Sequence, residues 1–75
     1  MTPAKARALL RRNGILDEVD ILVEKYGIHM IGRQPKGDMR WMAGAPGTPG
    51  VSYGDTLTHA VHTYIIESVL GETNE

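Results

Sequence analysis

The stretch that decides the fold is YGDTLTHAVHTYIIESVLG, residues 53–71 of the 75-residue chain. Asp55 follows a glycine and precedes a run of residues compatible with a helix, so it is predicted to cap a helix over 56–70. Gly71 is predicted to end that helix, because glycine readily takes the left-handed conformation found after a helix C-terminus. The chain is therefore expected to finish on one amphipathic helix.

This predicted helix carries two stripes of side chains at helical spacing. The first stripe is predicted to cover a sheet and consists of Leu57, Ala60, Val61, Tyr64 and Ser68. The second stripe lies on a different side and consists of His59, His62, Ile66 and Val69. One apolar face is enough to complete a two-layer domain. The second stripe is therefore predicted to be spare surface that a partner covers.

Upstream of this helix, two segments with strand character flank a turn. They are residues 28–33 and 39–43, and the intervening 34–38 has proline and glycine where a tight turn needs them. A β-hairpin is predicted over 28–45, with Trp41 anchoring its packed face. The proline- and glycine-rich loop 46–54 could hold a short third strand near 51–53.

The first 27 residues are predicted to be helical. Thr2 can cap a first helix that runs to Arg12, since Pro3 fits the first turn, where a backbone N–H would have no partner. Asn13-Gly14 is a favourable helix stop. A second amphipathic segment follows over 15–26, and pattern alone leaves open whether Gly14 breaks one long helix or separates two short ones. Ile21 falls outside the apolar stripe of this segment.

These elements predict an α+β class, in one domain over residues 1–75. The expected architecture is a two-layer sandwich with an N-terminal helix or helix pair, a β-hairpin and a C-terminal helix packed on the sheet. A chain this short buries only about 60 % of the surface its unfolded form exposes. It has no cysteine, so neither a disulfide nor a cysteine-ligated zinc can stabilise it. A partner subunit or a very economical core is therefore expected.

No secretory signal or membrane-spanning run is apparent, so the predicted location is the cytoplasm. The formal net charge is −1, but all eight Lys and Arg residues lie at or before Arg40. A set of exposed basic residues is therefore a candidate contact for nucleic acid or an acidic surface: Lys5, Arg7, Arg11, Arg12 and Arg40. The plainest interpretation of these charges is a set of solvated helix faces.

The acidic residues of the second helical segment weigh against a DNA-binding helix-turn-helix. The second helix of that motif enters the major groove, where phosphates would repel the carboxylates of Asp17, Glu18, Asp20 and Glu24. The same acidic face could instead imitate a row of phosphates and occupy a basic groove on another protein.

The candidate metal-binding and catalytic residue sets are incomplete. Asp55, His59 and His62 stand at helical spacing, and His29 could add a ligand, but zinc sites usually need a complete set and Asp55 is explained as a cap. No metal and no cofactor are predicted. The serines do not lie in a nucleophile elbow, and the glycine-rich loop lacks the lysine of a phosphate-binding loop. The chain is predicted not to be an enzyme.

Three short segments carry a resemblance to known families: KYGIHM at 25–30, RWMA at 40–43 and YGDTLTHAV at 53–61. Together they resemble small α-β-β-α sandwich proteins of phages and prophages, in which a tryptophan-bearing strand precedes a glycine-aspartate-threonine helix start. The stretch 41–61 is also similar to the HicB-like antitoxin domain. The chain departs from the antitoxin pattern because it begins helical and ends soon after its last helix, which leaves a partner-masking role as what that resemblance implies.

The leading functional prediction is a non-enzymatic protein-binding module. The phage resemblance implies a phage-encoded inhibitor of a host system, such as an anti-CRISPR protein. The predicted partner-contacting residues are Ile21, His59, His62, Ile66 and Val69. Three alternatives remain: an antitoxin-type masking domain, a homodimer that pairs its final helices across a two-fold axis, and a nucleic-acid-binding protein that uses its basic first helix.

Overall fold

The structure, a computed structural model, describes residues 2–29, 31–33, 41–47 and 50–71. Its α-helices are α1 (Pro3–Arg12), α2 (Val19–Lys25) and α3 (Leu57–Tyr64), and α3 continues as a π-helical segment, η1 (Ile65–Val69). Its strands are β1 (Gly32–Arg33), β2 (Trp41–Ala43) and β3 (Ser52–Gly54). The predicted α+β class is confirmed, as is the predicted packing of the C-terminal helix on the sheet.

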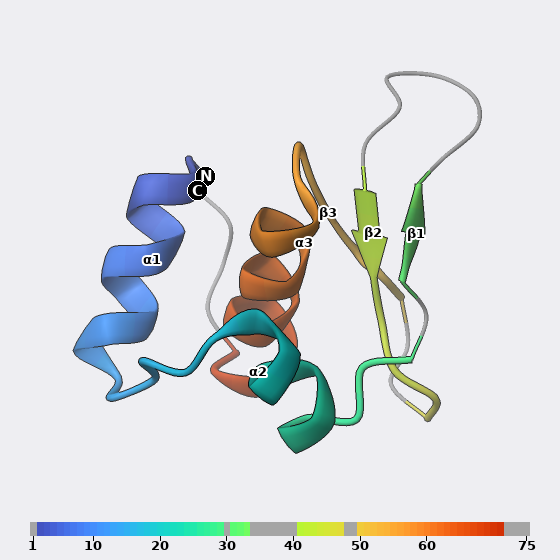
Figure 1. Cartoon of the computed structure of the whole chain (residues 1–75), viewed down its shortest axis with the longest axis horizontal. Coiled ribbons are helices and arrows are strands. Elements are labelled where there is room, and N and C mark those ends of the chain that lie inside the picture. Colours follow the sequence, from blue (N-terminus) through green and yellow to red (C-terminus); the bar gives the residue numbers. More distant parts are fainter. Residues whose placement is uncertain (1, 30, 34–40, 48–49, 72–75) are drawn as a thin grey trace.

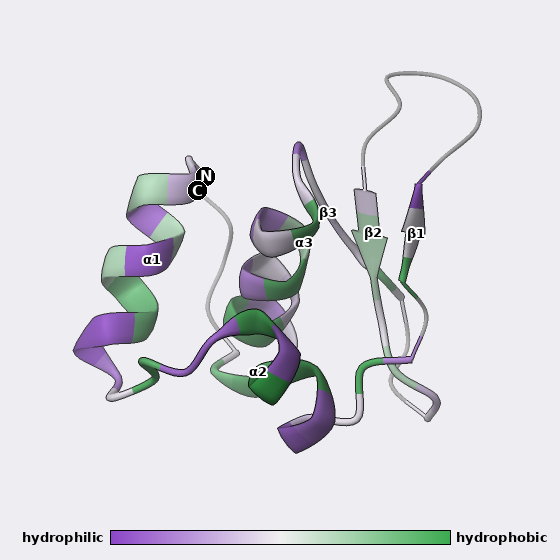
Figure 2. Ribbon diagram, viewed as in Figure 1, coloured by the Kyte–Doolittle hydropathy of each residue, from purple (hydrophilic) through white to green (hydrophobic). Residues whose placement is uncertain are grey.

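The helix α3 is the centre of the fold (Figure 1). One side of α3 packs on β2 and β3, while α1 and α2 pack on its other sides. Bands of hydrophobic and hydrophilic residues alternate along α1 in Figure 2, as expected of a helix with one packed face. The helical side of the fold is therefore two helices deep, with α3 between the sheet and α1.

The first helix begins and ends where the sequence predicts. The hydroxyl of Thr2 accepts a hydrogen bond from the Lys5 backbone N–H at 3.1 Å. At the other end, Asn13 is the C-cap, and its side-chain amide donates to the Leu9 carbonyl at 2.8 Å. Gly14 follows with φ of 75°, a conformation that favours glycine. Gly14 therefore separates two helices rather than breaking one.

The second helix is shorter than the predicted segment 15–26. The Ile15 backbone N–H donates to the Leu10 carbonyl at 2.9 Å, so Ile15 takes part in the C-terminal cap of α1. The chain then continues without helical structure to the N-cap Glu18, whose φ of −71° and ψ of 162° are extended, and α2 starts at Val19. Residues 15–18 thus form a connecting segment that packs beside α1.

The strands form one antiparallel sheet in the order β1-β2-β3. Gly32 pairs with Met42 and Arg33 with Trp41, as expected of a hairpin. The predicted turn at 34–38 lies outside the described residues. The third strand is present one residue later than predicted, at Ser52–Gly54. Trp41 is partly buried and packs against the core.

The predicted Asp55 cap is wrong by one residue. Thr56 is the N-cap of α3, and its hydroxyl accepts a hydrogen bond from the His59 N–H at 3.1 Å. The extended backbone of Thr56 places its short side chain within reach of the N–H three residues on, whereas Asp55 is one position too early and is exposed. The predicted end is confirmed, since Gly71 has φ of 72°.

The last turn of the helix departs from the α-helical period. A backbone bond from the Leu70 N–H to the Ile65 carbonyl, at 2.9 Å, has the i to i+5 spacing of a π-helix. Extrapolation with 3.6 residues per turn therefore fails here, and Ser68, predicted to face the sheet, is exposed. Glu67 contacts the sheet instead, because its carboxylate accepts a hydrogen bond from the Ser52 hydroxyl at 2.6 Å.

Candidate functional site between α1 and α3

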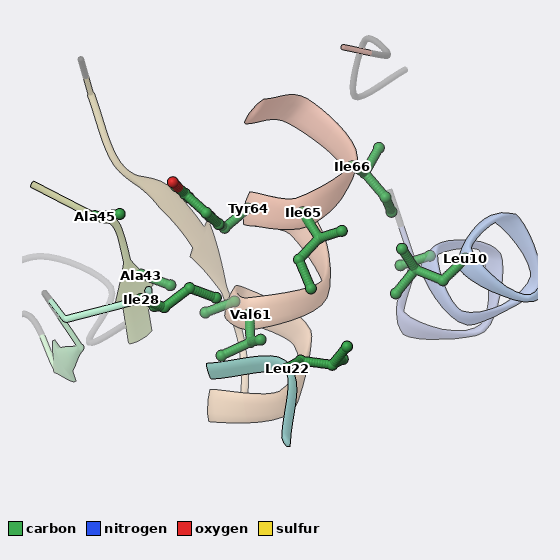
Figure 3. Close-up of a cluster of buried hydrophobic side chains, with 11 residues drawn as sticks. Leu10, Leu22, Ile28, Ala43, Ala45, Val61, Tyr64, Ile65 and Ile66 are labelled. Carbon is green, nitrogen blue, oxygen red and sulfur yellow. The ribbon is translucent and has the colours of Figure 1, made fainter. Parts of the chain in front are cut away.

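Three of the four residues in the second stripe of the last helix are buried. His59, His62 and Ile66 are only 8 %, 9 % and 0 % exposed. Figure 3 shows Ile66, in η1, on the side of the last helix that faces Leu10 of α1. The prediction that these three residues form a free docking surface is therefore wrong, because α1 packs on the face that a simple two-layer sandwich would leave open.

The two other predicted partner-contacting residues are exposed. Ile21 is 48 % exposed on α2, and Val69 is 45 % exposed in η1. Neither lies on the same element as the other, and neither lines the surface groove described below. The predicted set thus divides into a buried group on α3 and two separate exposed side chains.

The His59 ring is buried without hydrogen bonds inside the described part of the chain. Neither of its ring nitrogens has a partner there, although the His59 carbonyl accepts a hydrogen bond from the Thr63 hydroxyl at 2.8 Å. Burial of polar ring nitrogens without partners costs about 1–3 kcal/mol for each unsatisfied group. His59 is therefore a packing residue of the helical layer.

A surface groove of about 330 Å³ lies where α1, the connecting segment and the first turns of α3 meet. Its α1 wall is formed by Arg7, Leu10 and Arg11. The remaining lining residues come from the connecting segment, the start of α2 and α3, and they are Ile15, Leu16, Asp17, Glu18, Val19, Thr58 and His62. The lining therefore combines an apolar set with two guanidinium groups, two carboxylates and one imidazole.

The groove is polarised. Burial lowers the pKa of His62 below its ordinary value of 6.5, and the charge of Arg7 and the neighbouring His59 lower it further. Arg7 therefore acts at His62 as a nearby positive charge. The carboxylates of Asp17 and Glu18 belong to the connecting segment and the N-cap of α2, whereas the two guanidinium groups belong to α1. The lining thus has a basic part on α1 and an acidic part at residues 17–18, which we call its basic and acidic walls.

The His62 environment predicts a loss of stability in mild acid. Because the pKa of His62 is lower in the folded chain than in the unfolded chain, the unfolded state binds the proton first. The stabilisation is therefore complete above pH 6.5 and is lost as the pH falls from 6.5 through the lowered pKa. Urea midpoints at pH 7.5 and pH 5.5 should show this loss, and His62→Gln should reduce it. The original chain, measured at the same two pH values, is the reference for this difference.

The structure brings together residues that the sequence places in separate groups. Arg7 and Arg11 belong to the predicted basic set and His62 to the predicted docking stripe, yet all three line one groove. Lys5 and Arg12 are exposed on α1 but outside the groove, and Arg40 lies outside the described residues. The basic set is therefore divided between the groove and the outer face of α1.

Leu16 is a candidate site residue that was not among the residues predicted from the sequence. It is 71 % exposed, more than any other large apolar side chain in the described ranges. Leu16 lies within the helical segment predicted over 15–26, but the connecting segment is not helical, and Leu16 lines the groove. The helix-stop signal Asn13-Gly14 predicts where α1 ends, but it does not predict that Leu16 is exposed.

Among the described residues, no three His, Asp or Glu side chains gather closely enough to hold a metal ion. The same residues include no helix with the length and apolar character needed to cross a membrane. Comparisons with protein-family models, with curated proteins and with solved structures find no match to this chain.

Proposed function

We propose that the chain is a protein-binding module and that its groove beside α1 receives the partner. The observation that carries this proposal is Leu16, an apolar side chain 71 % exposed at the edge of a concave site. A concave site with apolar lining and a few polar groups is the usual form of a binding site, and Leu16 adds apolar surface at this one. The apolar part of the groove, from Leu10, Ile15 and Val19, suits the side chain of a protein better than a highly charged ligand.

The charges beside the apolar lining support a protein partner in particular. Arg7 and Arg11 on one wall, and Asp17 and Glu18 on the other, give the groove both signs of charge. A mixed rim around an apolar centre is the usual composition of a protein–protein contact. A nucleic acid would meet the acidic wall with repulsion. The narrower proposals, a phage-encoded inhibitor such as an anti-CRISPR protein or an antitoxin-type masking domain, rest on the sequence resemblance alone.

A selection of random peptides displayed on yeast, with the purified chain as bait, tests this proposal. Leu16→Asp should weaken binding of the enriched peptides at least tenfold, since the apolar contact it removes is worth about 1.5–3 kcal/mol. The matched control is Ile21→Asp, which adds the same charge at an exposed apolar position outside the groove and should preserve binding.

Two results would contradict the groove as the binding site. Loss of peptide binding in Ile21→Asp but not in Leu16→Asp would move the site to α2. Binding to duplex DNA at low salt, abolished by reversing the charges of α1 and indifferent to Leu16→Asp, would favour nucleic-acid binding instead. That second outcome is a defined alternative because the exposed side of α1 carries Lys5, Arg7, Arg11 and Arg12 without an acidic residue in Pro3–Arg12.

A further inference from the structure

The two charged walls of the groove are complementary to each other. Arg7 and Arg11 project from α1, while Asp17 and Glu18 belong to the connecting segment and the N-cap of α2. All four residues are exposed. In a two-fold symmetric contact, the same patch is present on both copies, and every contact from one residue to another is repeated in the reverse direction. An axis beside the groove can therefore pair the basic wall of each copy with the acidic wall of the other. A patch with a basic part and an acidic part can therefore be complementary in charge to a second copy of itself.

Leu16 supplies the apolar centre of such a contact. It is 71 % exposed and stands in sequence directly before Asp17 and Glu18. Its exposure shows that it does not fill the groove of its own chain. A two-fold axis beside the groove would carry Leu16 of each copy into the groove of the other, against Leu10, Ile15 and Val19. The neighbouring carboxylates would then approach the arginines of that second copy.

We propose that the occupant of the groove is a second copy of this chain, with Leu16 inserted reciprocally and the acidic wall of each copy opposite the basic wall of the other. This inference rests on the proposed function, because it takes the groove to be a protein-binding site. It differs from a dimer formed through the final helices, since burial of Ile66, His59 and His62 removes the surface such a dimer would use.

The size and charge of the patch set the expected behaviour of the dimer. A standard stable interface involves about 20–30 residues on each partner, whereas ten residues line this groove. The association is therefore expected to be weak and to weaken further with added salt, because its rim charges are exposed and screened. Sedimentation equilibrium over a wide concentration range is the appropriate measurement.

Charge-reversal variants of the full chain give the decisive experiment. The variant Arg7→Glu/Arg11→Glu makes both walls acidic, and Asp17→Arg/Glu18→Arg makes both walls basic. Each variant alone should dimerise at least tenfold more weakly than the original chain. An equimolar mixture of the two should form a one-to-one complex, because opposite charges again meet across the contact. Far-UV circular dichroism checks that each variant keeps its fold.

A matched control separates this contact from a general charge effect. Lys5→Glu/Arg12→Glu applies the same charge change to exposed positions of α1 outside the groove, so dimerisation should persist. A strictly monomeric mass for the original chain at high concentration, or a mixture of the reversed variants that stays monomeric, would overturn the proposed occupant. If peptide selection still finds Leu16-dependent binding, the protein-binding function stands without the dimer. If it finds none, both proposals fail.

Discussion

Gly54→Ala is expected to destabilise the chain by at least about 3 kcal/mol, at or beyond the upper end of ordinary overpacking costs. A β-carbon built on Gly54 would lie 2.5 Å from the Ala60 backbone nitrogen and 2.7 Å from the His59 carbonyl carbon. Both are backbone atoms of α3, so relief requires the whole helix to move away from β3. A chain of 75 residues is stable by only about 4–11 kcal/mol, and this substitution is therefore expected to leave much of it unfolded.

Gly32→Ala is the matched control for this effect. Gly32 is also a strand glycine without a left-handed backbone, and the nearest atom to a β-carbon there is the Met42 methyl, at an ordinary 3.8 Å. Its substitution should change stability by less than about 1 kcal/mol. Urea unfolding followed by the fluorescence of Trp41, the one tryptophan of the chain, measures both variants. Equal stability of the two variants would show that α3 does not approach β3 as closely as the structure describes.

The surroundings of Gly54 also show why much of the fold is predictable from sequence. The Gly-Asp-Thr start, the apolar stripe of Ala60, Val61 and Tyr64, and the cap at Thr2 are local signals, and each spans only a few residues. The close approach of strand to helix is consistent with them, since a small residue on each side permits tight packing. The identity and order of the helices and the pairing of the hairpin strands therefore follow from short-range patterns in the chain.

The errors share a different cause. The cap at Thr56 and the π-helical turn at Ile65–Val69 each depend on backbone geometry that a 3.6-residue period does not contain. The burial of Ile66 depends on the tertiary position of α1, far away in sequence. A stripe on a helix specifies that something covers it but not whether the cover is another molecule or the same chain. For this reason the predicted docking surface includes His59, His62 and Ile66, which are buried.

The groove could not be predicted for the same reason. Arg7 and His62 lie near opposite ends of the sequence and meet because α1 packs against α3. Leu16 becomes a surface residue only because the chain remains non-helical from Ile15 to Glu18. The sequence identifies the chemical groups of the site, arginines, carboxylates and a histidine, but their convergence is a property of the tertiary fold.

Ile66→Ala is expected to lower the free energy of unfolding by about 2–5 kcal/mol, the usual cost of truncating a fully buried isoleucine. Ile66 is 0 % exposed and lies on the side of α3 toward Leu10 (Figure 3), so the lost methyl groups leave a cavity between α1 and α3. Had Ile66 been a docking residue on a free surface, the same substitution would change stability by less than about 0.5 kcal/mol.

Val69→Ala provides the comparison on the same stripe, because Val69 is 45 % exposed and its truncation should cost little. Urea unfolding of both variants at about pH 8, well above the ordinary histidine pKa of 6.5, leaves His62 almost wholly neutral in both states and so separates packing from protonation. A large loss for Ile66→Ala with a small loss for Val69→Ala places the stripe under α1. Equal, small losses would show that Ile66 is not part of the core, because truncating a buried side chain destabilises a fold. Docking through the final helix would then again be supported.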